Sequence, residues 1–372
     1  MSSFQRIGDS DLNFDLSQNE ARVLHSLVKW PDLTDQAIHS HIGMKKSTFS
    51  SIKTRLKESH YYHRFFIPNF PVLDFELLFI MFGELNRFTT FDERMRVAGD
   101  MVKSFTEDFY VVSEANHSFS LSVSQNYTEY AKNQMEFMQV YSENKFLSKD
   151  GMTHVAFPFE ISQMLSFLDY ESLLARLFGF SSEPYETRKS IPFGRIKRIK
   201  LTKAEKKVLA GLIKYPDETD TLIADEVGVS RNTVANAKRK FLKKKICFPR
   251  VVPDIERLGL KTLVFNYTKY RPKLAPEDRA ETSEKIRMLL SPHFYIYKNL
   301  DGFIISAHES KESFDEVYTQ LYSFYRNKDY ILGDPINYYM NIPDMKLIKS
   351  INYLPMILKM LKFDPKIPIK DQ

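Results

Sequence analysis

The residues best suited to chemistry lie in one stretch of the second half of the chain. Between positions 230 and 240, hydrogen-bonding and basic side chains alternate with apolar ones at helical spacing. Arginine suits the edge of guanine, asparagine suits adenine, and lysine neutralises phosphates. The pattern therefore predicts a helix that contacts DNA in the major groove. The residues assigned to this contact are Ser230, Arg231, Asn232, Thr233, Asn236, Lys238, Arg239 and Lys240.

A turn and a preceding helix must position these side chains. Leu222, Ile223 and Val227 form an apolar face that ends before Gly228, where a left-handed turn costs glycine little. Ser230 is a suitable N-cap for the next helix, because its hydroxyl can accept a hydrogen bond from an otherwise unpaired backbone N–H. These features predict a helix-turn-helix with its recognition helix at 231–240. A helical hairpin with a solvated basic face is a commoner origin of such a pattern, so the recurrence of the unit matters.

The chain contains this unit twice. The stretch that begins at Leu16 aligns without a gap with the stretch that begins at Leu201, at a shift of 185 residues. An internal repeat of this length indicates a domain duplication. Each copy opens with a serine or threonine three residues before a glutamate, which is the spacing of a capping box. Identical pairs include Glu20/Glu205, Leu24/Leu209, Leu27/Leu212, Pro31/Pro216, Thr34/Thr219, Asp35/Asp220, Gly43/Gly228, Thr48/Thr233 and Lys53/Lys238.

The first copy carries a less distinctive recognition helix. Its start has fewer amide and arginine side chains, which predicts that it reads DNA less specifically or binds mainly the backbone. Two unequal recognition helices on one chain predict an asymmetric pair of half-sites. The residues assigned to DNA in this copy are Lys45, Lys46, Ser47, Thr48, Ser51, Lys53 and Arg55.

A second domain follows in each copy, because the shift of 185 continues beyond the helix-turn-helix. Strands are expected at 77–84, 108–114, 119–124 and 154–160, and again at 262–267, 294–298, 302–308 and 337–341. Helices are expected at 91–104 and 128–144, and again at 276–290 and 311–327, and each copy ends in an apolar helix, at 166–178 and 350–361. This order is that of the ferredoxin-like βαββαβ sandwich. The predicted fold class is therefore α+β, a tandem repeat of a winged helix-turn-helix followed by a ferredoxin-like domain.

The domain boundaries follow from this layout. Residues 1–15 are expected to form an N-terminal arm and 183–199 a basic linker, in which Arg195, Lys197, Arg198 and the adjoining Lys200 either follow phosphates or only keep the linker soluble. The first copy comprises a helix-turn-helix at 16–67 and a ferredoxin-like domain at 68–182. The second comprises the corresponding domains at 200–252 and 253–372.

Charge supports a polyanionic partner. The net charge is +6 over 372 residues, but residues 200–250 carry +7, residues 16–67 carry +4 and residues 181–199 carry +3, which leaves −8 for the rest. Positive charge is therefore concentrated on the two DNA-binding units and the segment that joins them. A single cysteine, Cys247, excludes an internal disulfide framework. The absence of a long apolar run or a signal-peptide core predicts a cytoplasmic protein with no membrane span, and no metal or other cofactor is expected.

The second copy resembles the Lrp/AsnC (feast/famine) family of transcription regulators. That family joins a winged helix-turn-helix to a ferredoxin-like domain that assembles dimers and binds amino-acid effectors near a β-turn. The resemblance implies double-stranded DNA as partner, a small-molecule effector and a homodimer as further possibilities, and places Asp301–Gly302 at the comparable turn, where the first copy has Asn116–His117–Ser118. Because two copies are fused here, an internal pseudo-dimer is expected. The residues that carry the resemblance are Leu201–Leu209, Gly228–Ser230, Thr233–Val234, Lys245–Ile246, Pro253–Leu260 and Leu263–Phe265.

Two other functions stay open at this point. A non-specific architectural or basal-machinery protein would use the same lysine-rich surface for backbone binding, and the specificity ratio separates it from a regulator. An enzyme is the other alternative, because some proteins of this fold decarboxylate tetrapyrroles with histidines. The first copy gathers His25, His39, His41, His60 and His63, but none has the spacing of a metal site with acidic partners. A binding protein without catalysis is therefore the prediction.

Overall fold

The computed structural model describes residues 16–182, 184, 193, 199–272 and 274–362. The expected N-terminal arm at 1–15 lies outside the described residues. So does most of the expected linker at 183–199, including Arg195, Lys197 and Arg198. Within the described ranges, no helix combines the length and the apolar character that crossing a bilayer requires.

Each copy begins with three helices and a strand, as predicted. Both capping boxes are present, with the Ser17 and Thr202 hydroxyls accepting from the Glu20 and Glu205 N–H groups. The first helix of each copy ends two residues before a proline, which cannot continue a helix. The elements of the first unit are α1 (Gln18–Lys29), α2 (Asp35–His41), α3 (Lys46–Glu58) and β1 (Tyr62–Pro68), and those of the second are α7 (Lys203–Lys214), α8 (Asp220–Val227), α9 (Arg231–Lys243) and β7 (Cys247–Pro253). We call residues 16–67 the first head and residues 200–252 the second head.

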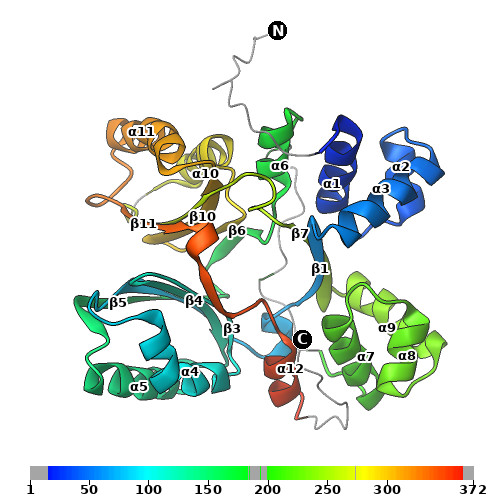
Figure 1. Ribbon diagram of the computed structural model, residues 1–372, viewed down its shortest axis with the longest axis horizontal. Helices are drawn as coiled ribbons and strands as arrows, with labels where there is room; N and C mark the ends of the chain where they lie inside the picture. The colour runs from blue at the N-terminus through cyan, green and yellow to red at the C-terminus, as the bar shows by residue number, and fades with distance from the viewer. Residues whose placement is uncertain (1–15, 183, 185–192, 194–198, 273, 363–372) are drawn as a thin grey trace.

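The two heads are joined by their strands. β1 and β7 pair antiparallel along their whole length, from Tyr62 opposite Pro253 to Pro68 opposite Cys247. Cys247 is buried in this junction, and burial raises the pKa of its thiol to about 12. An ion pair of 3.8 Å between Lys57 Nζ and Asp217 Oδ2 adds a second link. The heads therefore hold a defined relation to each other (Figure 1).

Both ferredoxin-like domains have the predicted order of elements. The first contains β2 (Leu77–Leu85), α4 (Phe91–Ser104), β3 (Asp108–Glu114), β4 (His117–Ser124), α5 (Tyr127–Glu143) and β5 (Leu147–Pro158). The second contains β8 (Thr262–Lys269), α10 (Pro276–Leu290), β9 (Phe294–Tyr297), β10 (Asp301–His308), α11 (Lys311–Lys328) and β11 (Ile336–Asn341). Two short 3₁₀ turns, Pro71–Leu73 and Ile342–Asp344, complete the two domains. The predicted α+β class and tandem layout are confirmed.

The copies exchange a strand, which the sequence analysis did not predict. β6 (Gln163–Phe167) leaves the first copy to pair with β9, and β12 (Lys346–Lys349) leaves the second copy to pair with β3. The sheets therefore run β12-β3-β4-β2-β5 and β11-β8-β10-β9-β6. The helices expected at 166–178 and 350–361 are shorter, α6 (Glu171–Phe178) and α12 (Leu354–Met360). The early part of the first apolar run is strand because the edge of the other sheet offers it backbone partners.

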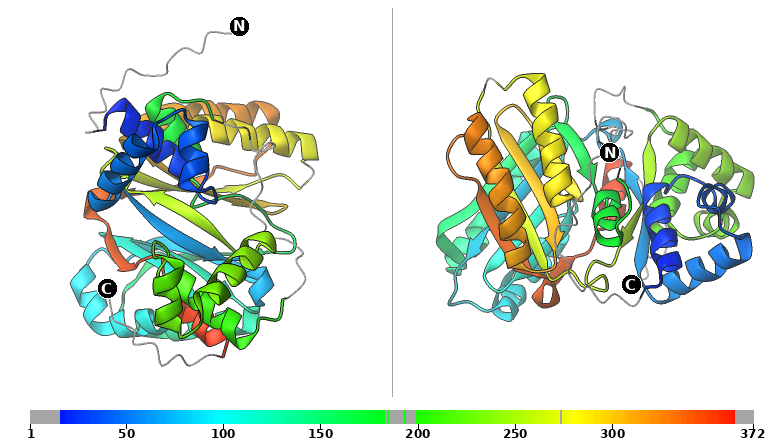
Figure 2. Two further views of the ribbon diagram at one scale, coloured as in Figure 1. Left: turned by 90° about the vertical axis from the view of Figure 1, so that its right-hand side faces the viewer. Right: turned by 90° about the horizontal axis from the view of Figure 1, so that it is seen from above.

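The two sheets pack face to face with their helices outside, so the ferredoxin-like part has four layers (Figures 1 and 2). Aromatic rings fill the space between the sheets. The ring centroid of Phe119 lies 4.2 Å from that of Phe265 and 5.9 Å from that of Phe303, and the ring centroid of Phe82 lies 5.3 Å from that of Phe303. The pairing of the two domains therefore takes place within one chain. Phe193, from the expected linker, is also buried, with its ring 5.2 Å from that of Phe70.

Candidate nucleic-acid interface

The turn of the second head has the predicted geometry. α8 ends at Gly228, whose φ of 64° is left-handed. Ser230 then caps α9, because its hydroxyl accepts from the Thr233 N–H at 3.1 Å. Val234, Ala237 and Phe241 are buried and hold one face of α9 against the rest of the head. The opposite face of this helix must therefore point to solvent.

A row of polar side chains follows that exposed face. Arg231, Asn232, Asn236 and Arg239 are all exposed, and none has a side-chain partner among the residues that the structure describes. Thr233, also assigned to DNA, is half-buried and bonds the cap, with its hydroxyl 2.8 Å from that of Ser230. The exposed row presents guanidinium and amide groups together, which are the groups that read base edges.

The first head has the same arrangement of helices, but the start of its recognition helix carries fewer amide and arginine side chains. Gly43 has a φ of 62°, and Phe49, Ile52 and Leu56 bury the inner face of α3. The N-cap residue is Lys45, which makes no capping hydrogen bond, whereas Ser230 does so in the second head. Of the residues assigned to DNA in this head, Lys45, Lys46, Ser47, Thr48 and Ser51 are exposed.

Four of the basic residues assigned to phosphates are paired inside their own head. In the second head, Lys238 Nζ donates to Asp220 at 3.1 Å and Lys240 Nζ donates to Glu205 at 2.5 Å. In the first head, Lys53 donates to Asp35 at 2.7 Å and Arg55 to Glu20 at 2.8 Å. Each pair of the first head lies 185 positions before a pair of the second head, so both pairs belong to the architecture that the two copies share. They tie each recognition helix to the two helices that precede it, and a DNA contact by these four residues stays a prediction.

The pKa values of the two glutamates in these pairs are lowered. Burial alone would raise the pKa of Glu205, but hydrogen bonds from Lys240 and from Thr202 lower the pKa below its ordinary value. The pKa of Glu20 is lowered in the same way, since Ser17 and Arg55 outweigh the effect of burial. The cations of α9 and its following turn that carry no ion pair within the described ranges are Arg231, Arg239, Lys243, Lys244 and Lys245.

The heads lie on one side of the molecule and the four-layer part on the other. Figure 1 shows α2 and α3 above α8 and α9 at the right, away from α5 and α11. The right-hand view in Figure 2, seen from above, shows the same separation of the heads from the four-layer part. Both recognition helices are therefore accessible without rearrangement of the sheets.

The turn implicated in effector binding by the resemblance differs between the copies. In the second copy, Asp301 accepts from the Tyr267 hydroxyl at 2.6 Å and pairs with Lys298 at 3.2 Å. A Cβ at Gly302 would lie 2.5 Å from Cε2 of Tyr270, so the Tyr270 ring already occupies the space beside this turn. Effector binding at this position is not supported by these contacts.

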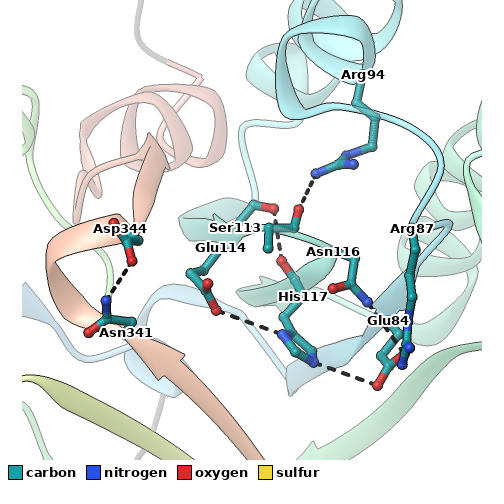
Figure 3. A network of polar contacts seen from close by, with 10 residues as sticks. Glu84, Arg87, Arg94, Ser113, Glu114, Asn116, His117, Asn341 and Asp344 are labelled. Carbon is teal, nitrogen blue, oxygen red and sulfur yellow. Dashed lines mark hydrogen bonds and ion pairs between the residues drawn. The ribbon is translucent and has the colours of Figure 1, made fainter.

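In the first copy, His117 occupies the place of Gly302 (Figure 3). Its Nε2 lies 3.6 Å from Glu84 Oε1 and its Nδ1 lies 3.7 Å from Glu114 Oε2. Arg87 donates to Glu84 at 3.1 Å and, with His117, lowers the pKa of that carboxyl. Side chains of the chain thus fill this turn as well, with a different set of charges.

The histidines grouped in the first head are dispersed in space. His39 and His41 lie beside the rings of Phe49 and Trp30, at 6.3 and 5.2 Å between ring centroids. His60 and His63 stack on each other at 6.2 Å, and His25 lies 3.4 Å from Glu171 of α6. Among the described residues, no group of three or more His, Cys, Asp or Glu side chains is placed to hold a metal ion.

Comparisons with known proteins address the fold. No protein-family model matches the chain, and no curated protein matches it either. Among solved structures, the siroheme decarboxylase NirDL matches 92% of this chain and 99% of its own, with a TM-score of 0.53 and 9% sequence identity. An AsnC family transcriptional regulator from Agrobacterium tumefaciens matches 37% of this chain and 89% of its own, with a TM-score of 0.32 and 15% identity. E. coli AsnC matches 38% of this chain and 93% of its own, with a TM-score of 0.31 and 16% identity.

The match to NirDL extends over both copies, and at 9% identity it shows the fold alone. The chain therefore shares its fold with NirDL, with two units in tandem, each a helix-turn-helix followed by a ferredoxin-like domain.

Proposed function

We propose that this protein is a DNA-binding transcription regulator that uses its two heads as an internal pseudo-dimer. The observation that carries the proposal is the exposed row of α9, formed by Arg231, Asn232, Asn236 and Arg239. A guanidinium and an amide at the start of a capped helix suit base edges in the major groove. Arg239 and the lysines after it suit phosphates.

The pairing of β1 with β7 supports recognition of two half-sites by one chain. Because these strands are hydrogen-bonded from Tyr62 to Pro68, the heads present α3 and α9 in a defined relation. The start of α3 offers Lys46 and Ser47 where α9 offers Arg231 and Asn232. The two half-sites should therefore differ in sequence, and the one read by α9 should be the better defined.

A selection from a random duplex library tests this function. The selection is performed near physiological salt, where non-specific phosphate contacts are weakened. We expect an enriched pair of unequal motifs at a fixed spacing. Asn232→Ala should relax the motif that belongs to α9, with a loss of discrimination of about 1–3 kcal/mol at one base pair. Ser47→Ala is the matched variant of the first head and should leave that motif unchanged.

Two outcomes would contradict the proposal. Tight binding without an enriched motif would favour the architectural alternative, in which the exposed run Lys243–Lys245 contacts the backbone regardless of sequence. An equal effect of Asn232→Ala and Ser47→Ala on both motifs would refute the assignment of one half-site to each head.

An enzyme is the second candidate, because NirDL has the same fold along its whole length. We propose binding without catalysis, since His293 and His308, two buried histidines of the second copy, make contacts typical of packing groups. His293 stacks on Tyr170 at 4.5 Å, and burial lowers its pKa to about 3. His308 is hydrogen-bonded to Ser306, and burial lowers its pKa as well. Titration with siroheme, followed by its absorption spectrum, tests this alternative, and stoichiometric binding would favour it.

A further inference from the structure

A cavity opens at one end of the second ferredoxin-like domain. It has a volume of about 330 Å³ and lies between the end of β8, the carboxyl end of α11 and the connection from α11 to β11. Its lining residues are Arg271, Tyr325, Arg326, Asp329, Ile331 and Gly333. Figure 1 shows α11 and β11 on the side of the molecule opposite the heads, so the DNA-binding function proposed above does not use this cavity.

Backbone hydrogen bonds fix the walls of the cavity. The Arg271 N–H donates to the Tyr330 carbonyl at 2.9 Å, and the Leu332 N–H donates to the Lys269 carbonyl at 2.8 Å. These two bonds tie the connection after α11 to the end of β8. Gly333 has a φ of 70°, and apart from its chain neighbours no described atom lies within 4 Å of the place where a Cβ would stand. The cavity is therefore preformed and has open space beside Gly333.

Two arginines supply hydrogen-bond donors to this cavity. The Arg271 guanidinium donates from Nη2 to Asp329 Oδ1 at 2.7 Å, and most of its five N–H groups have no protein acceptor in the described part of the chain. The Arg326 guanidinium lies 5.9 Å from the ring centroid of Tyr322 and makes no ion pair within the described ranges. The neighbouring Asp334 carboxylate accepts from the Tyr322 hydroxyl at 2.5 Å. Both carboxylates are thus engaged, while guanidinium donors remain for an anion.

The internal repeat indicates that the fold does not require these arginines. The N-caps of α5 and α11, and matching backbone hydrogen bonds in the two domains, identify the corresponding positions. In the places of Arg271, Arg326 and Asp329, the first copy has Asn86, Ser142 and Lys145. There the Asn86 side chain donates to the Lys145 carbonyl at 2.7 Å. The pair of arginines is therefore a property of the second copy alone.

We propose that this cavity binds a small molecule that carries a phosphate group. A guanidinium donates two parallel hydrogen bonds to an oxyanion and is more weakly hydrated than an ammonium. Arg271 and Arg326 come from two different elements, and a phosphate offers three acceptor oxygens to share between them, whereas a carboxylate offers two. The ion pair with Asp329 holds the Arg271 guanidinium in place. The volume lies at the lower end of the range for small-molecule sites.

Equilibrium dialysis of the full chain against radiolabelled inorganic phosphate, at an ionic strength held constant with sodium chloride, tests the proposal. One saturable site per chain is expected. Arg271→Asn and Arg326→Ser install the residues of the first copy, and each should weaken phosphate binding about tenfold or more. Arg257→Ser is the matched control and should leave binding unchanged, because Arg257 is also paired with a carboxylate and is 49% exposed, against 47% for Arg271. Circular dichroism confirms that the variants are folded.

Further comparisons separate this site from the heads. Arg239→Ser removes an exposed cation of α9 and should leave the phosphate site intact, whereas Arg326→Ser should leave duplex binding intact, so a failure of one proposal is distinguishable from a failure of the other. The absence of a saturable phosphate site, or an Arg326→Ser variant that binds phosphate like the wild type, would overturn the proposal. Succinate that displaces phosphate at an equal or lower concentration would overturn the assignment of a phosphate in favour of a carboxylate.

Discussion

Replacing Asp220 with asparagine should strengthen the dependence of DNA binding on salt. In the wild type the Asp220 carboxylate holds Lys238 Nζ at 3.1 Å, so this ammonium is already neutralised. Asp220→Asn removes the carboxylate and frees the lysine for a phosphate. Each added phosphate contact steepens the plot of log affinity against log salt by about 0.9. A rise in salt of about fourfold should then weaken binding by about 3.5-fold more than in the wild type.

The cost of this change to folding should be small. The two side chains are 34% and 28% exposed, so the pair contributes at most about 0.5 kcal/mol after screening by solvent. Fluorescence anisotropy with a labelled duplex over a series of salt concentrations measures the slope. Asp225→Asn is the matched control, because Asp225 is exposed on the same helix and makes no contact with Lys238 in the described residues. Equal slopes for the two variants would refute the view that Asp220 withholds Lys238 from DNA.

Three further predictions concern the framework of the heads and sheets. Ser230→Ala removes the cap of α9 and should lower the free energy of unfolding by about 1 kcal/mol. Lys45→Ser supplies the cap that α3 lacks and should raise the free energy of unfolding by a similar amount. Urea denaturation measures both changes, and an unchanged stability of Lys45→Ser would mean that α3 is capped in another way. Gly302→Ala should cost about 1–3 kcal/mol, because the new Cβ would lie 2.5 Å from Tyr270, and an unchanged denaturation midpoint would contradict this contact. Burial raises the pKa of Asp108 to about 7, so the folded state retains a proton that the unfolded state releases above about pH 4. The free energy of unfolding of the wild type should therefore fall as pH rises from about 4 to about 7, whereas Asp108→Asn has no such carboxyl to ionise. The difference in stability between this variant and the wild type should grow over that range. A difference that does not change with pH would contradict the raised pKa of Asp108.

Local signals in the sequence predicted much of the fold. The capping boxes, the left-handed Gly228 and the cap at Ser230 depend on residues a few positions apart, so sequence alone identifies them. The helix α4 at 91–104 and the strand β3 at 108–114 have the predicted bounds. The internal repeat added long-range information, because it indicated that both copies share one architecture.

The features that sequence analysis missed all depend on distant partners. Ser166 lies in an apolar run that suggests a helix, yet it belongs to β6 because β9 of the other copy offers an edge. The sequence predicts a basic linker at 183–199, yet Phe193 within it is buried against Phe70 from another part of the chain. The ion pairs of Lys238 and Lys240 join residues 18 and 35 positions apart, so the spacing alone could not separate these lysines from cations free to meet DNA.

The central claim is that one chain reads two half-sites with heads in a defined relation, and the dependence of affinity on half-site spacing tests it most directly. Duplexes are compared in which about 5 or about 10 base pairs, half a turn or a full turn of DNA, are inserted between the selected half-sites. Because β1 and β7 are paired along seven residues each, both insertions should abolish the contribution of the weaker half-site. Affinity that does not change with spacing would contradict the account, because it would mean that the heads bind DNA independently.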